Sequence, residues 1–149
     1  PAQAGSTTAV QASQVQAGGL ETVLVVEDDD MVRELAVSML QDQGYTVLSA
    51  ASGQECLELL NSHEGRIDLM LTDVIMPDMN GKTLFERVVL HDPDIRVLFM
   101  SGYTDNVISH HGVLDNGVAF LQKPFSFQDL SLKVREVLDS PVADYREPV

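Results

Sequence analysis

Polar side chains that could do chemistry stand at the ends of apolar runs in this sequence. Glu27 and Asp28 follow the first β-branched run, and Asp73 ends another apolar run. Ser101 and Lys123 follow two further apolar runs. In an open α/β sheet, the carboxyl ends of the strands form the edge where ligands and reactions gather. We therefore expect these five side chains to meet in one site.

The types of these side chains suit phosphoryl transfer to a carboxylate. Three neighbouring carboxylates repel one another unless a cation lies between them. Ligands that are all oxygen favour a hard ion such as Mg²⁺, which also binds phosphate oxygens. The Lys123 ammonium and the Ser101 hydroxyl could bind an anion beside Asp73, which would then act as the nucleophile. Each residue alone is more often a turn or cap residue, and only their combination favours the functional interpretation.

The pattern of apolar residues predicts five strands that alternate with five helices. Near-continuously apolar strands separated by helices indicate a parallel sheet with helices on both faces. Right-handed crossovers favour the flavodoxin-like strand order 2-1-3-4-5, in which the first and third strands are neighbours. The expected strands cover residues 22–26, 45–50, 67–73, 95–100 and 117–121, and the expected helices begin near residues 31, 52, 82, 105 and 126.

Composition divides the chain into three parts. Residues 1–20 are rich in Ala, Gln, Ser, Thr and Gly and carry no charged side chain, which predicts a linker or a disordered lead-in. Residues 21–139 are the expected folded domain, and residues 140–149 are an expected flexible tail. Because the first residue is Pro rather than Met, we expect the chain to be part of a longer protein.

The overall composition limits the expected partners and location. A chain of 149 residues that is 44% apolar can form one core. The net charge of −14 repels nucleic acid and anionic membranes, so neither is an expected partner. The single cysteine, Cys56, fits a buried thiol in a reducing compartment. With no signal-peptide pattern, we expect a cytoplasmic domain, even if its parent protein is anchored in a membrane.

Four sequence blocks, at residues 25–29, 72–81, 100–102 and 123–125, resemble the signature of the response-regulator receiver domain. The resemblance covers about residues 21–138. It implies a flavodoxin-like domain that accepts a phosphoryl group from a histidine kinase or a histidine phosphotransfer domain and promotes its own phosphorylation and dephosphorylation. The implied roles are phosphoacceptor for Asp73, ligation of Mg²⁺ or Mn²⁺ for Glu27, Asp28, Asp73 and the Ile75 carbonyl, and contact with the phosphoryl group for Ser101 and Lys123.

The resemblance also implies a conformational switch made of Ser101 and Phe120. This switch changes the surface formed by the fourth helix, the fifth strand and the fifth helix, and a phosphorylation-dependent dimer is a further expectation. Position 27 holds Glu where the family more often has Asp, which adds one methylene to the reach of the carboxylate.

Two bulky residues are expected beside the phosphoryl group. Ile75 and Tyr103 follow Asp73 and Ser101 by two positions each. Neither side chain has an amide or a carboxylate that could orient an attacking water molecule. We therefore expect the phosphorylated form to hydrolyse slowly.

Parts of the sequence are similar to receivers fused behind sensor histidine kinases. These parts are residues 100–105, residues 120–125 and the lead-in at residues 18–22. The favoured interpretation is therefore the terminal receiver of a hybrid histidine kinase, whose parent chain is the kinase. A stand-alone response regulator is the alternative.

Three other kinds of protein fit the sequence less well. A phosphohydrolase with an Asp nucleophile would need a second acid two residues later, where Ile75 stands. A pseudo-receiver would not need the full set of acids, hydroxyl and lysine. A flavin-binding protein would need a hydroxyl-rich phosphate loop after the first strand, whereas residues 27–30 are all acidic and would repel a phosphate.

Overall fold

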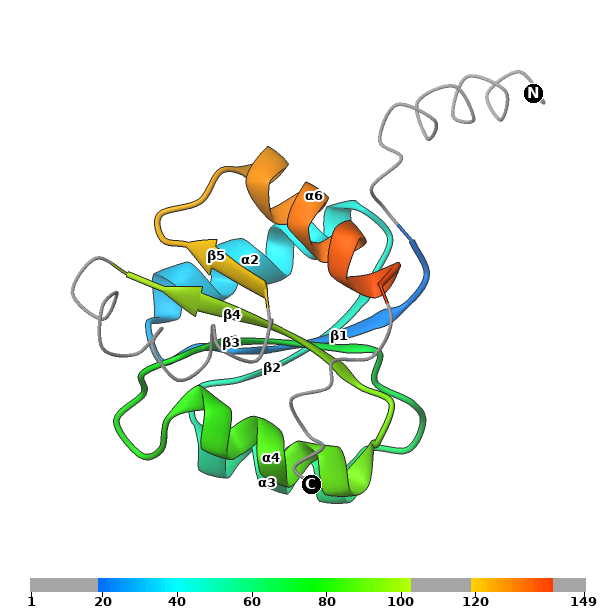
Figure 1. Ribbon diagram of the computed structural model, residues 1–149, viewed down its shortest axis with the longest axis vertical. Helices are drawn as coiled ribbons and strands as arrows, with labels where there is room; N and C mark the ends of the chain where they lie inside the picture. The colour runs from blue at the N-terminus through cyan, green and yellow to red at the C-terminus, as the bar shows by residue number, and fades with distance from the viewer. Residues whose placement is uncertain (1–18, 103–118, 141–149) are drawn as a thin grey trace.

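The computed structural model describes residues 19–102 and 119–140, in which strands and helices alternate along the chain (Figure 1). Across these residues, no helix combines the length and the apolar character needed to cross a membrane. The strands are β1 (Thr22–Val26), β2 (Thr46–Ala50), β3 (Leu69–Asp73), β4 (Arg96–Ser101) and β5 (Ala119–Gln122), and the helices are α2 (Asp30–Asp42), α3 (Gly53–Ser62), α4 (Gly81–His91) and α6 (Phe127–Leu138).

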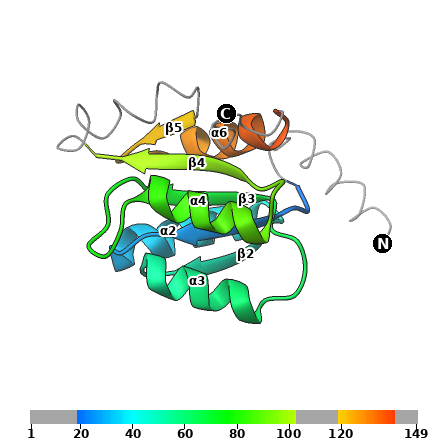
Figure 2. The same ribbon diagram turned by 60° about the horizontal axis from the view of Figure 1, so that its bottom comes forward.

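The five strands form one parallel sheet in the order β2-β1-β3-β4-β5, which confirms the predicted topology. Helices α2 and α6 cover one face of the sheet, and helices α3 and α4 cover the other (Figures 1 and 2). The described residues contain these four helices. The further helix that we expected from about residue 105 falls outside the described residues.

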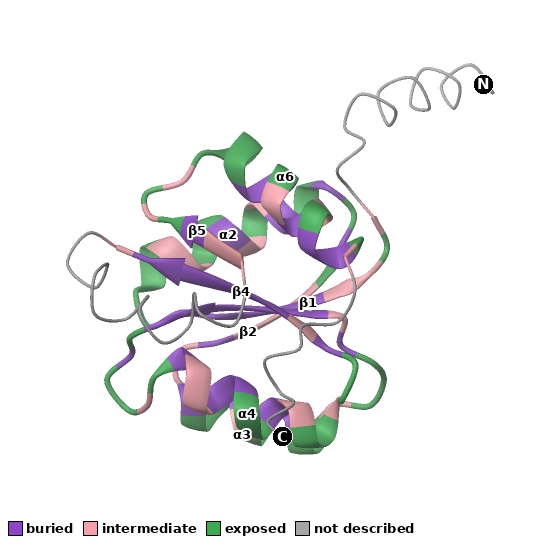
Figure 3. Cartoon of the chain, viewed as in Figure 1, coloured by how far each residue is buried: buried purple, intermediate pink, exposed green. Residues whose placement is uncertain are grey.

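Successive side chains of a strand point to opposite faces, and helices cover both faces, so the central strands β1, β3 and β4 are buried on both sides. In β1, Leu24 and Val26 belong to the apolar cluster beneath α3 and α4, whereas Val23 and Val25 belong to the cluster beneath α2 and α6. Figure 3 shows the buried strands between the two layers of helices. This double burial explains why the strands read as continuous apolar runs rather than as alternating ones.

Each described helix is preceded by an N-cap residue whose side chain accepts a backbone N–H from the first turn of the helix. The N–H groups of the first turn have no acceptor within the helix itself. The N-cap residues are Asp29 for α2, Ser52 for α3, Asn80 for α4 and Ser126 for α6. At α6, the Asp129 carboxylate accepts the backbone N–H of Ser126 and completes a capping box with it. Replacement of one such cap by Ala typically costs about 1 kcal/mol of stability.

Two details of the helices differ from our expectations. The apolar spacing in α2 predicts that Met31, Leu35 and Met39 share the inward face with Val32, Ala36 and Leu40. Ala36 and Leu40 are buried, but Met31 and Leu35 are 78% and 48% exposed. The stripe that packs on the sheet runs through Ala36 and Leu40, with Val37 and Met39 partly buried against the same cluster. At α3, the spacing of Ser52 and Glu55 predicts a reciprocal capping box. The Glu55 carboxylate instead accepts the N–H of Ala51, so the box does not form.

The ends of the described chain are held at the amino edge of the sheet, where the strands begin. Arg135 of α6 donates to Glu21, which precedes β1, at 2.7 Å between Nη2 and Oε2. Arg96, the first residue of β4, donates from Nε to the carbonyl oxygen of Ser140 at 2.8 Å. Both ends therefore lie opposite to the carboxyl edge.

The core of α4 offers a direct test of this packing. Phe85 is fully buried, whereas Leu90 in the same helix is 82% exposed. We expect Phe85→Ala to lower the free energy of unfolding by about 3–5 kcal/mol, because it removes buried apolar surface and leaves a cavity. Leu90→Ala, the matched control, should change it by less than about 0.5 kcal/mol. Urea denaturation measures both values, and similar losses for the two variants would contradict the described orientation of α4.

Candidate functional site

The register of the sheet brings the acids after β1 and β3 together. Val26 pairs with Thr72 in the parallel ladder between these strands. The residues that follow them, Glu27 and Asp73, therefore emerge side by side at the carboxyl edge. Both are buried, with 1% and 5% of their surface exposed.

The neighbouring strands bring a hydroxyl and a lysine to the same edge. Ser101, at the end of β4, pairs with Gln122 at the end of β5. The next residue, Lys123, donates its backbone N–H to the Ser101 carbonyl at 2.8 Å, which extends the ladder by one residue. The side chain of Ser101 is buried beside this position, with 1% exposed.

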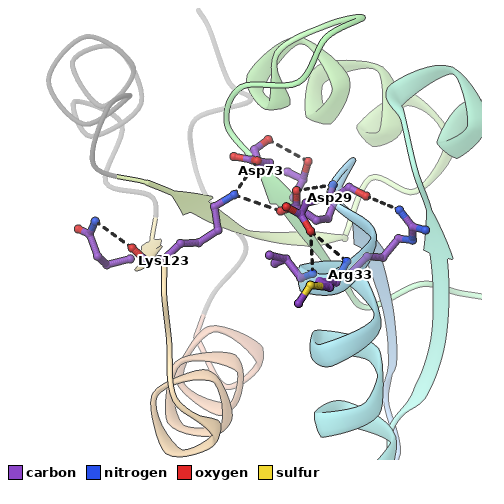
Figure 4. A network of polar contacts seen from close by, with 9 residues as sticks. Asp29, Arg33, Asp73 and Lys123 are labelled. Carbon is purple, nitrogen blue, oxygen red and sulfur yellow. Dashed lines mark hydrogen bonds and ion pairs between the residues drawn. The ribbon is translucent and has the colours of Figure 1, made fainter.

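The Lys123 ammonium joins the carboxylates of two strands (Figure 4). Its Nζ lies 2.9 Å from Asp73 Oδ2 and 3.3 Å from Glu27 Oε1. The other oxygen of Glu27 accepts the backbone N–H of Asp29 at 2.9 Å. Both oxygens of the Glu27 carboxylate are therefore held by the protein.

The buried charges shift the pKa values of these groups. Burial, assisted by the negative charge of Asp73, raises the pKa of Glu27 in spite of its hydrogen bonds from Asp29 and Lys123. Burial also disfavours the charged form of Lys123, but the hydrogen bonds and charges of Asp73 and Glu27 outweigh it and raise the pKa of the ammonium. The lysine is therefore charged at neutral pH and partly neutralises the acids.

Asp28 completes a cluster of three carboxylates. Glu27, Asp28 and Asp73 each bring one oxygen to within 4.8 Å of the others, and Asp28 is exposed. One lysine cannot neutralise three carboxylates, so an excess of negative charge remains at the opening of the site. A set of ligands that consists only of oxygen, with this charge, fits a hard divalent cation such as Mg²⁺.

The loop from residue 74 to residue 80 lies directly after Asp73. The Gly81 N–H donates to the Val74 carbonyl at 2.7 Å and closes the loop. A Cβ atom at Gly81 would overlap the Asp73 carbonyl oxygen, so this close approach requires glycine. Within the loop, the side chain of Ile75 is 49% exposed beside the site.

The two residues of the expected switch lie on neighbouring strands. Phe120 in β5 packs its ring against Phe99 in β4, with 5.8 Å between the ring centroids. Ser101 ends the same strand as Phe99. Tyr103, the second residue expected to affect hydrolysis, falls outside the described residues.

Our sequence reasoning did not identify Arg33 as part of this site. Its Nη1 donates to the Glu27 carbonyl at 2.9 Å, and its Nη2 lies 2.6 Å from Asp30 (Figure 4). Asp29, which lies between Glu27 and Asp30 in the chain, is the N-cap of α2 (Figure 4). The preference of Asp for N-caps and the three-residue spacing of Asp30 and Arg33 were the available signals.

Comparison with known proteins assigns the family. The sequence model described as "Response regulator receiver domain" matches residues 23–135. The chain belongs to the response regulator receiver family. It is thus a receiver domain of two-component signalling, with the fold of that family.

Several relatives of this receiver are close in sequence. The sensor kinase CckA of Brucella abortus strain 2308 is 43% identical over 121 residues, which are 81% of this chain but 13% of CckA. The response regulator receiver protein CpdR of the same organism is 30% identical over 119 residues and is covered over 98% of its length. This chain therefore spans a small part of one relative and nearly all of the other.

Solved structures agree with this assignment. The receiver domain of the hybrid histidine kinase CckA aligns with a TM-score of 0.66 and 35% identity, covering 79% of this chain and 99% of that one. A CheY-like receiver from Methanospirillum hungatei JF-1 aligns with a TM-score of 0.70 and 30% identity, covering 81% of this chain and 95% of that one.

The raised pKa of Glu27 predicts a change of stability with pH. In the folded protein, Glu27 keeps its proton to higher pH than in the unfolded chain, where its pKa is near the ordinary value of 4.5. As the pH rises from about 4.5 through the raised pKa, the receiver should therefore lose stability from this group. Glu27→Gln removes this loss, so the variant should gain stability relative to the wild type over the same range.

Urea denaturation at several pH values, in buffer with a chelator, measures this difference. Glu34→Gln, on the exposed side of α2, is the matched control and should leave the pH profile of the wild type unchanged. Parallel profiles for Glu27→Gln and the wild type would contradict the predicted cost of the buried carboxylate.

Proposed function

We propose that Asp73 of this receiver accepts a phosphoryl group from a phosphohistidine of a histidine kinase or a histidine phosphotransfer domain. The observation that carries this proposal is the contact of Lys123 with both Asp73 and Glu27 at the carboxyl edge of the sheet. A buried carboxylate beside an ammonium and two further acids has the charges that phosphoryl transfer needs. The family of the chain supports the same conclusion.

In this mechanism, a carboxylate oxygen of Asp73 attacks the phosphorus atom in line with the bond to histidine. A P–O bond forms while the P–N bond breaks, and the electron pair of the P–N bond stays on the imidazole nitrogen. Lys123 offsets the negative charge of the phosphoryl oxygens. Glu27, Asp28, Asp73 and the Ile75 carbonyl would hold Mg²⁺ or Mn²⁺, which supplies further positive charge for the phosphoryl oxygens.

The response to phosphorylation is proposed to involve Ser101 and Phe120. The Ser101 hydroxyl would donate to the new acyl phosphate, and the Phe120 ring would move into the space that opens beside β4. The movement would change the surface that β5 and α6 form with the segment between β4 and β5. The contact of Phe120 with Phe99 supports this proposal, because Phe99 lies in β4 two residues before Ser101, so a change at Ser101 can alter the packing of the Phe120 ring.

For the parent protein, we favour a hybrid histidine kinase with this domain as its receiver. The identity of 43% to CckA supports this proposal. The nearly complete coverage of CpdR supports the alternative, a stand-alone receiver. A reading frame that continues into a kinase core would distinguish the two. In both cases we propose a cytoplasmic domain, and a phosphorylation-dependent dimer stays a proposal.

The phosphoacceptor proposal is tested by incubation with acetyl phosphate and Mg²⁺, followed by mass spectrometry of the intact chain and of its peptides. We expect one phosphoryl group on Asp73 in the wild type and a loss of labelling of about a hundredfold or more in Asp73→Asn, which lacks the nucleophile. Asp94→Asn, at the opposite edge of the sheet, is the control and should be labelled normally. Full labelling of Asp73→Asn would refute the assignment.

The lifetime of the phosphorylated form tests the role of Ile75. Because an apolar side chain there cannot orient a water molecule, Ile75→Asn should shorten the lifetime several-fold, and Tyr103→Glu should act in the same direction. Ile75→Val keeps the apolar character and should leave the lifetime close to that of the wild type. The decay of the labelled protein, followed by mass spectrometry, measures each rate, and an unchanged or slower decay in Ile75→Asn would count against this role.

A further inference from the structure

We propose that Asp78 is a positioning residue of this site: it ties the loop after Asp73 to the first turn of α3 and thereby fixes the backbone at Ile75. The inference rests on the proposed function, because it concerns the loop that carries a proposed ligand of the cation. It assigns a role to a residue outside the proposed ligands of the cation and of the phosphoryl group.

Asp78 reaches across to a helix that is distant in the sequence. Its Oδ1 accepts the backbone N–H of Gly53 at 3.2 Å, and its Oδ2 accepts the backbone N–H of Gln54 at 2.9 Å. Both donors belong to the first turn of α3, which has no acceptor for them within the helix. The carboxylate thus holds two backbone groups of another element with both of its oxygens.

The electrostatics of α3 favour this contact. Partial burial opposes ionisation of Asp78, but the hydrogen bonds from Gln54 and Gly53 outweigh it and hold the pKa of the carboxyl below its usual value. The positive end of the helix dipole favours a carboxylate at the same place. Asp78 is therefore ionised, and bonded as a charged acceptor, throughout the neutral range.

Met79 makes a second contact with the same helix end. A Cβ atom at Gly53 would lie 2.6 Å from Met79 Cγ and 2.8 Å from its sulfur, so the Met79 side chain rests directly on this glycine. Gly53 is buried beneath it. The loop is thus attached to α3 by a pair of hydrogen bonds and by an apolar contact from the next residue.

The attachment lies in the middle of a loop whose two ends are already fixed. The loop leaves β3 at Asp73, and the Gly81 N–H bonds back to the Val74 carbonyl at 2.7 Å. Between these points the loop passes the start of α3 (Figure 2). A backbone ligand such as the Ile75 carbonyl binds a cation well only if its position is set before the cation arrives. Asp78 and Met79 supply that constraint.

The role of Asp78 can be separated from simple capping of α3, because a second residue caps the same helix. The Ser52 hydroxyl oxygen accepts the N–H of Glu55 at 3.0 Å and belongs to the chain just before the helix. Loss of Ser52 would weaken the start of α3 but leave the loop attached. Loss of Asp78 would both weaken the helix start and release the loop.

The experiment compares Asp78→Ala with Ser52→Ala in the whole chain. Amide hydrogen exchange without divalent cations reports on Gly81, which closes the loop, and Mn²⁺ titration reports on the cation affinity. We expect Asp78→Ala to speed exchange at Gly81 about tenfold and to weaken Mn²⁺ binding several-fold, because local opening becomes easier. Ser52→Ala should leave both values close to those of the wild type. Asp78→Asn, which keeps one acceptor oxygen, should lie between the two.

Two outcomes would overturn this inference, and a third would refute the proposed function instead. Equal effects of Asp78→Ala and Ser52→Ala on Gly81 exchange and on Mn²⁺ affinity would overturn it, because the residue would then only cap a helix. A loss of Mn²⁺ affinity that vanishes in high salt, with Gly81 exchange unchanged, would also overturn it, since the lost charge alone would explain the effect. A wild type that acetyl phosphate does not label would refute the proposed function, while the exchange comparison would still decide the role of Asp78.

Discussion

The site depends on the contact of one ammonium with two carboxylates from different strands. Asp73 and Glu27 are buried side by side because β1 and β3 are neighbours in the sheet. Two such carboxylates repel each other strongly where they are poorly solvated. Lys123, the residue after β5, offsets that repulsion with its ammonium 2.9 Å from Asp73 and 3.3 Å from Glu27. An uncompensated buried charge would be far more costly than any single apolar contact near it. The strand order, the register and the lysine are thus all required together to hold the two buried carboxylates side by side.

The same charges explain how the site can respond to its ligands. Glu27 uses both oxygens within the protein, whereas Asp28 is exposed at the opening. The cluster keeps an excess of negative charge that the fold itself does not neutralise, which is a cost in stability that functional sites often carry. A cation and a phosphoryl group change that balance in opposite directions. Under the proposed phosphorylation, a local change of charge would be linked to the packing of the strand ends around Ser101.

Much of this arrangement could be predicted from the sequence because it follows from strong, simple patterns. Continuous apolar runs specify buried parallel strands, and a polar residue at the end of each run marks one edge, so the pattern by itself places Asp73 and Lys123 near each other. The contact of Asp78 with α3 could not be predicted in this way, because it depends on how a loop approaches a helix from another part of the chain. The spacing of Asp30 and Arg33 indicates their ion pair, but the contact of Arg33 with the Glu27 carbonyl also depends on how the chain turns from β1 into α2. The exposure of Met31 and Leu35 could not be predicted either, because apolar spacing alone does not show which of two adjacent stripes of α2 packs against the sheet.

The two ends of the described chain leave the domain at the edge opposite to the site, where Arg135 holds Glu21 and Arg96 holds Ser140. A domain tethered to either end would therefore start on the side of the receiver opposite to Asp73, away from the proposed phosphodonor. This geometry makes the receiver modular. It fits a receiver that is a small part of a long kinase, as the match to CckA is, and also one that is nearly the whole of a short protein, as the match to CpdR is.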